Sequence, residues 1–289
     1  MTANGLSHPG PTTIGVFDSG FGGLTVLRAL LHRIPQARFT FLGDSARLPY
    51  GSKSRRTISR YAVQSARFLV EEQGAQFLVI ACNTASALAL DAIQQAVPVP
   101  VLGVIEPGAT AARAASKTGD VLVIATDATF QSHAYAAACQ TRGLRALEKA
   151  CPLLVPLVEE GWTQHPVTTQ VIRIYLSEIF AEAQARGLNP DALVLGCTHY
   201  PLIQPLIEQA AREFAPDGFR VIDSAEAAAE AALNLIQGTA AQTSAAQPDE
   251  AEVAAIQCFA TDSVDKFERL GSRFLGRPVG KVQLVDLGG

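Results

Sequence analysis

Short apolar segments alternate along this chain with longer stretches whose apolar residues recur every three or four positions. Helical spacing of this kind occurs at residues 24–34 and at 57–73, where Gly74 ends the pattern. The segment 77–81 is apolar throughout, which is typical of a strand buried on both faces of a parallel sheet. The strand-like segments are residues 12–17, 38–43, 77–81, 120–126, 191–196 and 219–224. Strands that alternate with helices predict an α/β fold with parallel sheets.

The two halves of the chain carry similar motifs. In the first half, IGVFDSG opens a strand-turn-helix unit and LVIACNTAS follows; in the second half, VLVIATDAT opens a unit and LVLGCTHYP follows. Any α/β protein repeats such units, and that alone explains the rhythm. It explains less well why each half places one cysteine, Cys82 or Cys197, directly after an apolar strand. We therefore predict two similar α/β domains.

Beyond residue 236 the pattern changes twice. Residues 237–252 are low in complexity and predict a linker or flexible loop. The segments 255–260, 264–276 and 282–287 then predict a strand, a helix and a strand that dock on one of the sheets.

Composition narrows the class of protein. A chain of 289 residues favours two domains, and 48% hydrophobic residues allow a large core. No apolar run reaches the roughly 18 residues that a membrane-spanning helix needs, and the first residues, MTANGLSHPGPTT, do not resemble a secretory signal. We expect a cytoplasmic protein that does not enter a membrane. The net charge of −4, without a basic stripe, argues against nucleic acid as a partner.

The chain has five cysteines, an odd number that argues against a disulfide framework. No two of them have the C-x-x-C spacing of structural zinc sites, so we expect no bound metal. We assign Cys139, Cys151 and Cys258 to packing. Cys82 and Cys197 remain open to two interpretations, because free cysteine is among the most buried residue types.

Three polar clusters follow predicted strands: Asp18-Ser19, Cys82 to Thr84, and Cys197 to His199. Ligands of open α/β sheets bind beyond the carboxyl ends of the strands. Each cluster precedes a helix, and a thiol at a helix start is expected to have its pKa lowered. Asp18 fits equally well as a helix N-cap, and His199 as a structural histidine.

The glycine-rich turn DSGFGG is a weak match to a cofactor site. Gly20 and Gly22 fit the dinucleotide fingerprint G-x-G-x-x-G, but the third position is Thr25. We interpret the turn as one whose backbone N–H groups approach a small anion such as a carboxylate. None of the five lysines lies in a convincing Schiff-base context, and we expect no cofactor.

Two thiols on opposite sides of a substrate could invert a carbon stereocentre. One removes a proton from one face, the other delivers a proton to the opposite face, and the roles exchange in the reverse reaction. Without an electron-sink cofactor, hydrogen-bond donors must stabilise the carbanion through the substrate carboxylate. Ser19, Asn83, Thr84 and Thr198 are donors of the right kind.

Six motifs together resemble the glutamate racemases of the cofactor-independent Asp/Glu racemase family. They are IGVFDSGFGGLTVLRAL, GDSARLPYG, LVIACNTASA, GVIEPGA, CPLLVPLVEEG and LVLGCTHYPL. The resemblance implies that Cys82 acts on the D-enantiomer and Cys197 on the L-enantiomer. It further implies catalytic roles for Asp18 beside Cys82 and for His199 and Glu159 beside Cys197. The substrate-binding residues that it implies are Asp18, Ser19, Tyr50, Gly51, Asn83, Thr84, Thr198 and His199.

The resemblance also implies an architecture and a biological role. Residues 1–104 with 222–289 would form the first domain and 105–221 the second, with the active site in the cleft between them. The expected partners are L- and D-glutamate and a second copy of the chain in a homodimer. The D-glutamate would supply peptidoglycan biosynthesis.

Three alternatives remain open at this stage. A racemase of aspartate or another acidic amino acid would use the same two thiols. A binding protein would keep the pocket without catalysis, although the presence of both thiols argues against this. A hydrolase acting through Cys197 and His199 would leave Cys82 without a role, so replacing each thiol separately distinguishes it from a racemase.

Overall fold

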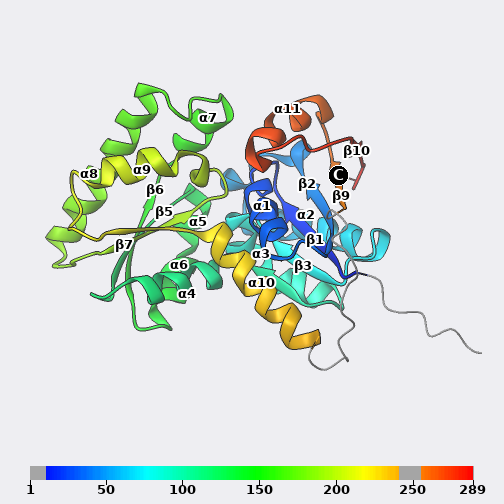
Figure 1. The fold of residues 1–289 in the computed structure, drawn as a ribbon, viewed down its shortest axis with the longest axis horizontal. Helices are drawn as coiled ribbons and strands as arrows, with labels where there is room; N and C mark the ends of the chain where they lie inside the picture. The colour runs from blue at the N-terminus through cyan, green and yellow to red at the C-terminus, as the bar shows by residue number, and fades with distance from the viewer. Residues whose placement is uncertain (1–10, 241–254, 289) are drawn as a thin grey trace, which may run out of the picture.

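Two parallel sheets flanked by helices form the computed structural model, which describes residues 11–240 and 255–288 (Figure 1). Residues 1–10 and residues 241–252 of the predicted linker lie outside the described residues. The prediction of an α/β fold with two parallel sheets is confirmed.

In the described part of the chain, six strands form the first sheet in the order β10-β9-β2-β1-β3-β4, and every neighbouring pair is parallel. Four strands form the second sheet, also parallel, in the order β6-β5-β7-β8. The strands of the first sheet are β1 (Thr13–Asp18), β2 (Arg38–Gly43), β3 (Phe77–Ile80), β4 (Val101–Gly103), β9 (Ile256–Ala260) and β10 (Val282–Leu284). Those of the second are β5 (Asp120–Ala125), β6 (Arg145–Ala150), β7 (Ala192–Gly196) and β8 (Arg220–Asp223).

The two sheets share one topology. The order β2-β1-β3-β4 in the first sheet corresponds to β6-β5-β7-β8 in the second. Strand β1 therefore matches β5, and β3 matches β7, as the paired motifs predict. The chain changes sheet between β4 and β5 and again between β8 and β9. The exact domain boundaries at residues 104 and 222 stay predictions.

Helices flank both sheets (Figure 1). The helices that alternate along the chain with strands of the first sheet are α1 (Leu24–Arg33), α2 (Arg55–Arg67), α3 (Asn83–Ala96) and α11 (Val264–Leu275). Those from residue 105 to 240 are α4 (Ile105–Ala115), α5 (Asp127–Ser132), α6 (Ala134–Gln140), α7 (Leu154–Glu159), α8 (Pro166–Ala185), α9 (Gln204–Ala211) and α10 (Ser224–Ala240). Ser54 caps α2 by accepting a hydrogen bond from the Thr57 N–H, and a π-helical turn at Phe68–Glu72 extends the helix to the predicted end before Gly74.

Helix α10 lies between the two halves (Figure 1) and contacts α1 on one side and α4 on the other. Its contact face consists of small residues, which let neighbouring helices approach closely. The buried alanines are Ala225, Ala228, Ala229 and Ala232. The helix includes residues 237–240, so the prediction that the linker begins at residue 237 is wrong there. The helix continues through these four residues, QGTA, although Gly238 has a low helix propensity.

The C-terminal strand, helix and strand dock on the first sheet, as predicted. Strand β9 pairs with β2, and β10 pairs with β9. Helix α11 packs against α1. The docked segment therefore brings α11 beside the loop that follows β1.

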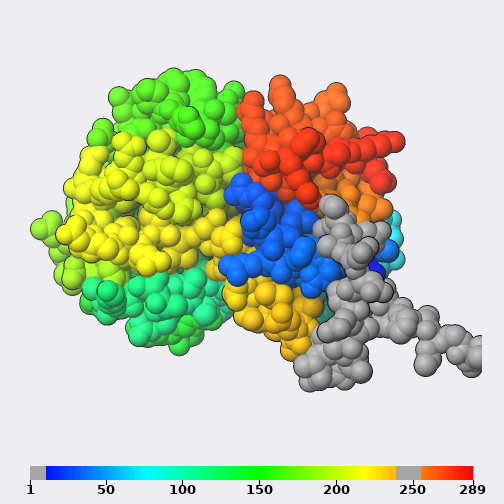
Figure 2. All heavy atoms as spheres, in the orientation of Figure 1, coloured from blue at the N-terminus to red at the C-terminus, as the bar shows by residue number. Residues whose placement is uncertain are grey.

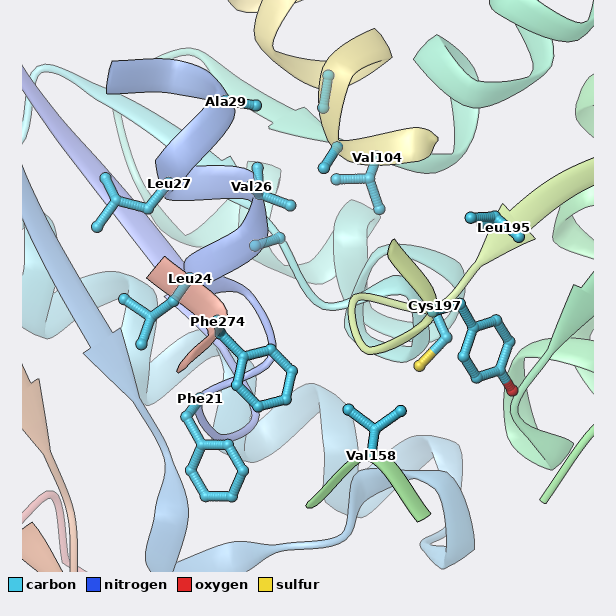
Figure 3. Packing of buried hydrophobic residues seen from close by; sticks show 14 of the residues in the cluster. Phe21, Leu24, Val26, Leu27, Ala29, Val104, Val158, Leu195, Cys197 and Phe274 are labelled. Atoms are coloured by element: carbon cyan, nitrogen blue, oxygen red, sulfur yellow. The ribbon is translucent and has the colours of Figure 1, made fainter. Parts of the chain in front are cut away.

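One apolar core runs through both halves. It includes Val26 of α1, Val104 before α4, Leu195 of β7 and Phe274 of α11, all nearly or fully inaccessible to water (Figure 3). Cys139, Cys151 and Cys258 are fully buried and pack as predicted. None of the helices within residues 11–240 and 255–288 has the length and apolar character required to span a bilayer.

The small-residue face of α10 makes a prediction about stability. We expect Ala228→Leu to lower the free energy of unfolding by about 1–3 kcal/mol, because the larger side chain has no space between α10 and its neighbours. Urea unfolding measures the change. Ala231→Leu, on the partly exposed side of the same helix, is the control, and an equal loss there would contradict the role of the buried face.

Candidate active site

The polar clusters stand at equivalent ends of the two sheets. Asp18 ends β1, and Cys82 follows β3; in the second sheet Thr126 follows β5, and Cys197 follows β7. The carboxyl ends of parallel strands meet at one edge of a sheet, so each sheet contributes one thiol and one further polar group at that edge.

Cys82 caps the first turn of α3. Its Sγ lies 3.4 Å from the Ala85 backbone N–H that it accepts, and 3.3 Å from the Ser19 hydroxyl. The thiol is only 5% exposed. The prediction that the helix start lowers its pKa is wrong: burial, followed by the charge of Asp18, raises the pKa of Cys82 to about 12, against the hydrogen bonds from Ser19 and Ala85.

Asp18 is buried beneath the loop between β1 and α1. Its Oδ2 accepts the Gly20 backbone N–H at 2.9 Å, whereas Oδ1 has no hydrogen-bond partner within the described residues. The N-cap of α1 is Gly23, so the interpretation of Asp18 as that cap is wrong. Burial raises the pKa of Asp18, and the opposing influences are the positive charge of His199 and the N–H groups of Gly20 and Gly23.

Cys197, His199 and Glu159 form a chain of contacts in the second half. The Cys197 Sγ lies 3.9 Å from His199 Nδ1, and His199 Nε2 lies 3.2 Å from Glu159 Oε1. Burial lowers the pKa of His199, but hydrogen bonds to Cys197 and Glu159 outweigh it and raise the pKa to about 10. The helix expected directly after Cys197 begins as a 3₁₀ turn, Tyr200–Ile203, before α9.

The glycine-rich turn DSGFGG packs against both Asp18 and His199. A Cβ atom at Gly22 would lie 2.3 Å from Thr198 Oγ1 and 2.6 Å from two ring atoms of His199. A Cβ atom at Gly23 would lie 2.6 Å from the Asp18 Cβ. Two adjacent glycines therefore let one loop touch the side of Asp18 and the side of His199. Thr25 fixes the same contact by donating its hydroxyl to the Thr198 carbonyl at 3.0 Å.

Tyr50 and Gly51 lie on the loop after β2, and Tyr50 is held by a buried carboxylate. The Tyr50 hydroxyl donates to Asp44 Oδ2 at 2.6 Å, and Thr261 from the C-terminal segment donates to Asp44 Oδ1 at 2.9 Å. Burial, followed by the charge of Asp44, raises the pKa of Tyr50. The Tyr50 hydroxyl is thus engaged in holding the loop, and the backbone beside Gly51 faces Thr126.

Asn83 and Thr84 contact the second half of the molecule. Asn83 Oδ1 accepts a hydrogen bond from the Tyr135 hydroxyl at 2.7 Å. The Thr84 hydroxyl lies 3.2 Å from those of Thr126 and Thr129, which are 3.0 Å apart. Sequence reasoning did not name these two threonines. The repeat was a signal for Thr126, which follows β5 at the position that Ser19 holds after β1.

A surface cavity of about 160 Å³ lies where α7 meets α11. Figure 2 shows this contact between the C-terminal segment, in red, and the green upper part of the other half. The lining residues are Glu159, Glu160, Lys266, Arg269, Leu270 and Arg273. Cys82 and Cys197 lie below the surface, so a cleft that reaches both thiols stays a prediction. Over residues 11–240 and 255–288, no three His, Cys, Asp or Glu side chains are grouped to hold a metal ion.

Comparison with known proteins decides the family. A model of the family described as Asp/Glu/Hydantoin racemase matches residues 23–232. This chain belongs to that family. The resemblance inferred from the sequence motifs is therefore confirmed.

Individual racemases match over almost the whole chain. A glutamate racemase of Koribacter versatilis is 52% identical, over 96% of this chain and 98% of its own. Among solved structures, a glutamate racemase of Bacillus anthracis has a TM-score of 0.83 at 34% identity, with 96% and 98% of the two chains covered. The glutamate racemase of Francisella tularensis, solved with D-glutamate, has a TM-score of 0.82 at 33% identity and the same coverage. The chain is an amino-acid racemase.

The contact at Gly22 generates a prediction for racemase turnover. We expect Gly22→Ala to lower kcat at least about 100-fold, because the new methyl group must displace Thr198 or the His199 ring. Steady-state kinetics measure the effect. Gly238→Ala, with nothing within 4 Å of the new atom, is the control. Unchanged turnover in Gly22→Ala would mean that the loop yields without disturbing the site.

His199 generates a prediction about pH. Its pKa in the folded protein, about 10, exceeds the ordinary value of about 6.5, so folding favours the protonated ring. The stabilisation is fully present below pH of about 6.5 and is lost as the pH rises toward about 10. The difference in unfolding free energy between the wild type and His199→Asn should therefore shrink over that range in urea titrations, which the exposed His32→Asn control should not reproduce. A constant difference would contradict a protonated ring.

Proposed function

We propose that this racemase interconverts L- and D-glutamate through Cys82 and Cys197, without a cofactor. The observation that carries the proposal is the placement of the two thiols after equivalent strands, β3 and β7, of two sheets with one topology. Each thiol has its own polar neighbours: Ser19 for Cys82, and His199 with Glu159 for Cys197. The similarity to named glutamate racemases supports the choice of substrate.

Two proton transfers constitute the reaction. From L-glutamate, the Cys197 thiolate takes the Cα proton and becomes a thiol, leaving its electron pair on Cα. The Cys82 thiol then gives its proton to the opposite face and becomes a thiolate. The product is D-glutamate, and the protonation states of the two cysteines have exchanged. The reverse reaction begins at Cys82.

The neighbouring groups adjust the charges of the two thiols. His199, whose pKa is raised, places a positive charge beside Cys197, with Nδ1 3.9 Å from the sulfur. Cys82, whose pKa is raised, starts as the thiol, which is the form that the conversion of L- to D-glutamate requires. The unpartnered Oδ1 of Asp18 is free to accept a hydrogen bond from the substrate ammonium group or a proton from Cys82. Glu159 holds the outer nitrogen of His199.

The substrate is bound by polar groups from both halves. We assign this role to Asp18, Ser19, Tyr50, Gly51, Asn83, Thr84, Thr198 and His199. Tyr50 contributes through its backbone, because its hydroxyl is held by Asp44. Backbone N–H groups and hydroxyls that face the substrate carboxylate would stabilise the negative charge that develops beside it when the proton leaves.

The biological setting follows from the family resemblance. We propose a cytoplasmic homodimer whose D-glutamate supplies peptidoglycan synthesis. The two-domain division at residues 104 and 222, with the site in the cleft between the domains, belongs to the same proposal.

Proton NMR in D₂O tests the proposal. Purified protein without added cofactor should remove the α-proton signal of L-glutamate, and of D-glutamate, while optical rotation decays. Exchange of the α-proton of aspartate alone would mean that the substrate is aspartate and would leave the proposed mechanism unchanged. Exchange on neither acid would defeat the proposed activity.

Separate replacement of the thiols tests the two-base mechanism. Cys82→Ala and Cys197→Ala should each abolish racemisation, whereas Cys139→Ala, at a buried thiol away from the strand ends, should retain it. Racemisation by Cys82→Ala would contradict the two-thiol mechanism. Cys197 and His199 would then be the reactive pair.

A further inference from the structure

Polar atoms fix the His199 ring within its own plane. Nε2 faces Glu159 at 3.2 Å, and Nδ1 faces the Cys197 sulfur at 3.9 Å and the Thr198 hydroxyl at 3.4 Å. The edge that carries Nδ1 also lies against the backbone of Gly22. All of these contacts engage the rim of the ring, so they limit its rotation in the plane more than its tilt.

Aromatic side chains limit the tilt. The Phe274 ring lies 4.9 Å from the His199 ring, centre to centre, at an interplanar angle of 77°. Phe21 lies 6.3 Å from His199 and 5.8 Å from Phe274. Phe274 is 1% exposed, so its buried ring fills the space beside the imidazole and holds the imidazole in one orientation. Figure 3 shows the rings of Phe21 and Phe274 on the side toward which the Cys197 sulfur points.

The contact joins parts of the molecule that are far apart in the chain. Phe274 belongs to α11, which the pairing of β9 and β10 ties to the first sheet. His199 follows β7 of the second sheet. The C-terminal segment docks on the first sheet and also contacts His199, which follows the second sheet.

The orientation of the His199 ring decides whether its Nδ1 stays in contact with the Cys197 sulfur. A separation of 3.9 Å between nitrogen and sulfur is long for a hydrogen bond, and a small tilt of the ring breaks it. We infer that Phe274 is a positioning residue that holds His199 toward Cys197 and thereby supports proton transfer on the L-glutamate side. The inference rests on the proposed function.

Rates alone cannot locate the affected step. L- and D-glutamate have equal free energies, so kcat/KM must fall equally in both directions whichever thiol is impaired. A deuterium isotope effect does locate it, because the effect is full only when the α-deuteron is in flight in the slower transition state. Deuterium on L-glutamate reports the Cys197 step, and deuterium on D-glutamate reports the Cys82 step.

The test is Phe274→Leu, which removes the ring and keeps an apolar side chain. We expect kcat/KM to fall about tenfold in both directions. The isotope effect on kcat/KM should rise with α-deuterated L-glutamate and fall toward one with α-deuterated D-glutamate. Phe267→Leu is the matched control, because Phe267 is also buried on α11 and packs on Phe21 without a ring contact to His199. Its isotope effects should equal those of the wild type.

Each other outcome overturns the inference. Unshifted isotope effects in Phe274→Leu, a shift toward the D-side, or the same shift in Phe267→Leu would show that Phe274 only packs. Phe274→Met is measured alongside, with thermal melting of each variant, so that a misfolded protein cannot decide the result. Wild-type protein is assayed first, and absence of racemisation there contradicts the proposed function. If the wild type is active but the isotope effects of the variants are unshifted, only the inferred role of Phe274 is contradicted.

Discussion

The close approach of the Gly22 backbone to Thr198 and His199 is the contact on which the site depends. A single methyl group would not fit between them, since its carbon would come within 2.3 Å of the Thr198 oxygen. The loop after β1 carries Asp18 on one side and reaches His199 on the other. The two polar groups of the site are thus kept at a fixed spacing by main chain, which varies less than contacts between long side chains.

Burial makes the electrostatics of the site depend on that spacing. Asp18, His199 and both thiols are nearly inaccessible, so each charge is stabilised by neighbouring groups and not by water. The positive charge of His199 opposes the rise in the pKa of Asp18, and Asp18 in turn raises the pKa of Cys82. A proton that moves at one thiol therefore changes the affinity for protons across the whole site.

Sequence patterns predicted the sheets better than they predicted the surroundings of the site. Continuous apolar strands such as β3 and β7 were visible, whereas β4 is three residues long and β6, RALEKA, mixes charged with apolar residues. The thiol positions followed from the strand ends, but the raised pKa of Cys82 depends on tertiary burial. The contact of Phe274 with His199 joins residues 75 positions apart (274 − 199), and no local pattern records it.

The path of the chain implies where the two halves can separate. The chain leaves the first sheet after β4 and the second after β8, and α10 contacts both β4 and α4. The covalent connections thus gather at α10, whereas α7 and α11 meet at the other end of the contact (Figure 1). Any separation of the two halves would turn about α10, and a separation of α7 from α11 would also part Phe274 on α11 from His199.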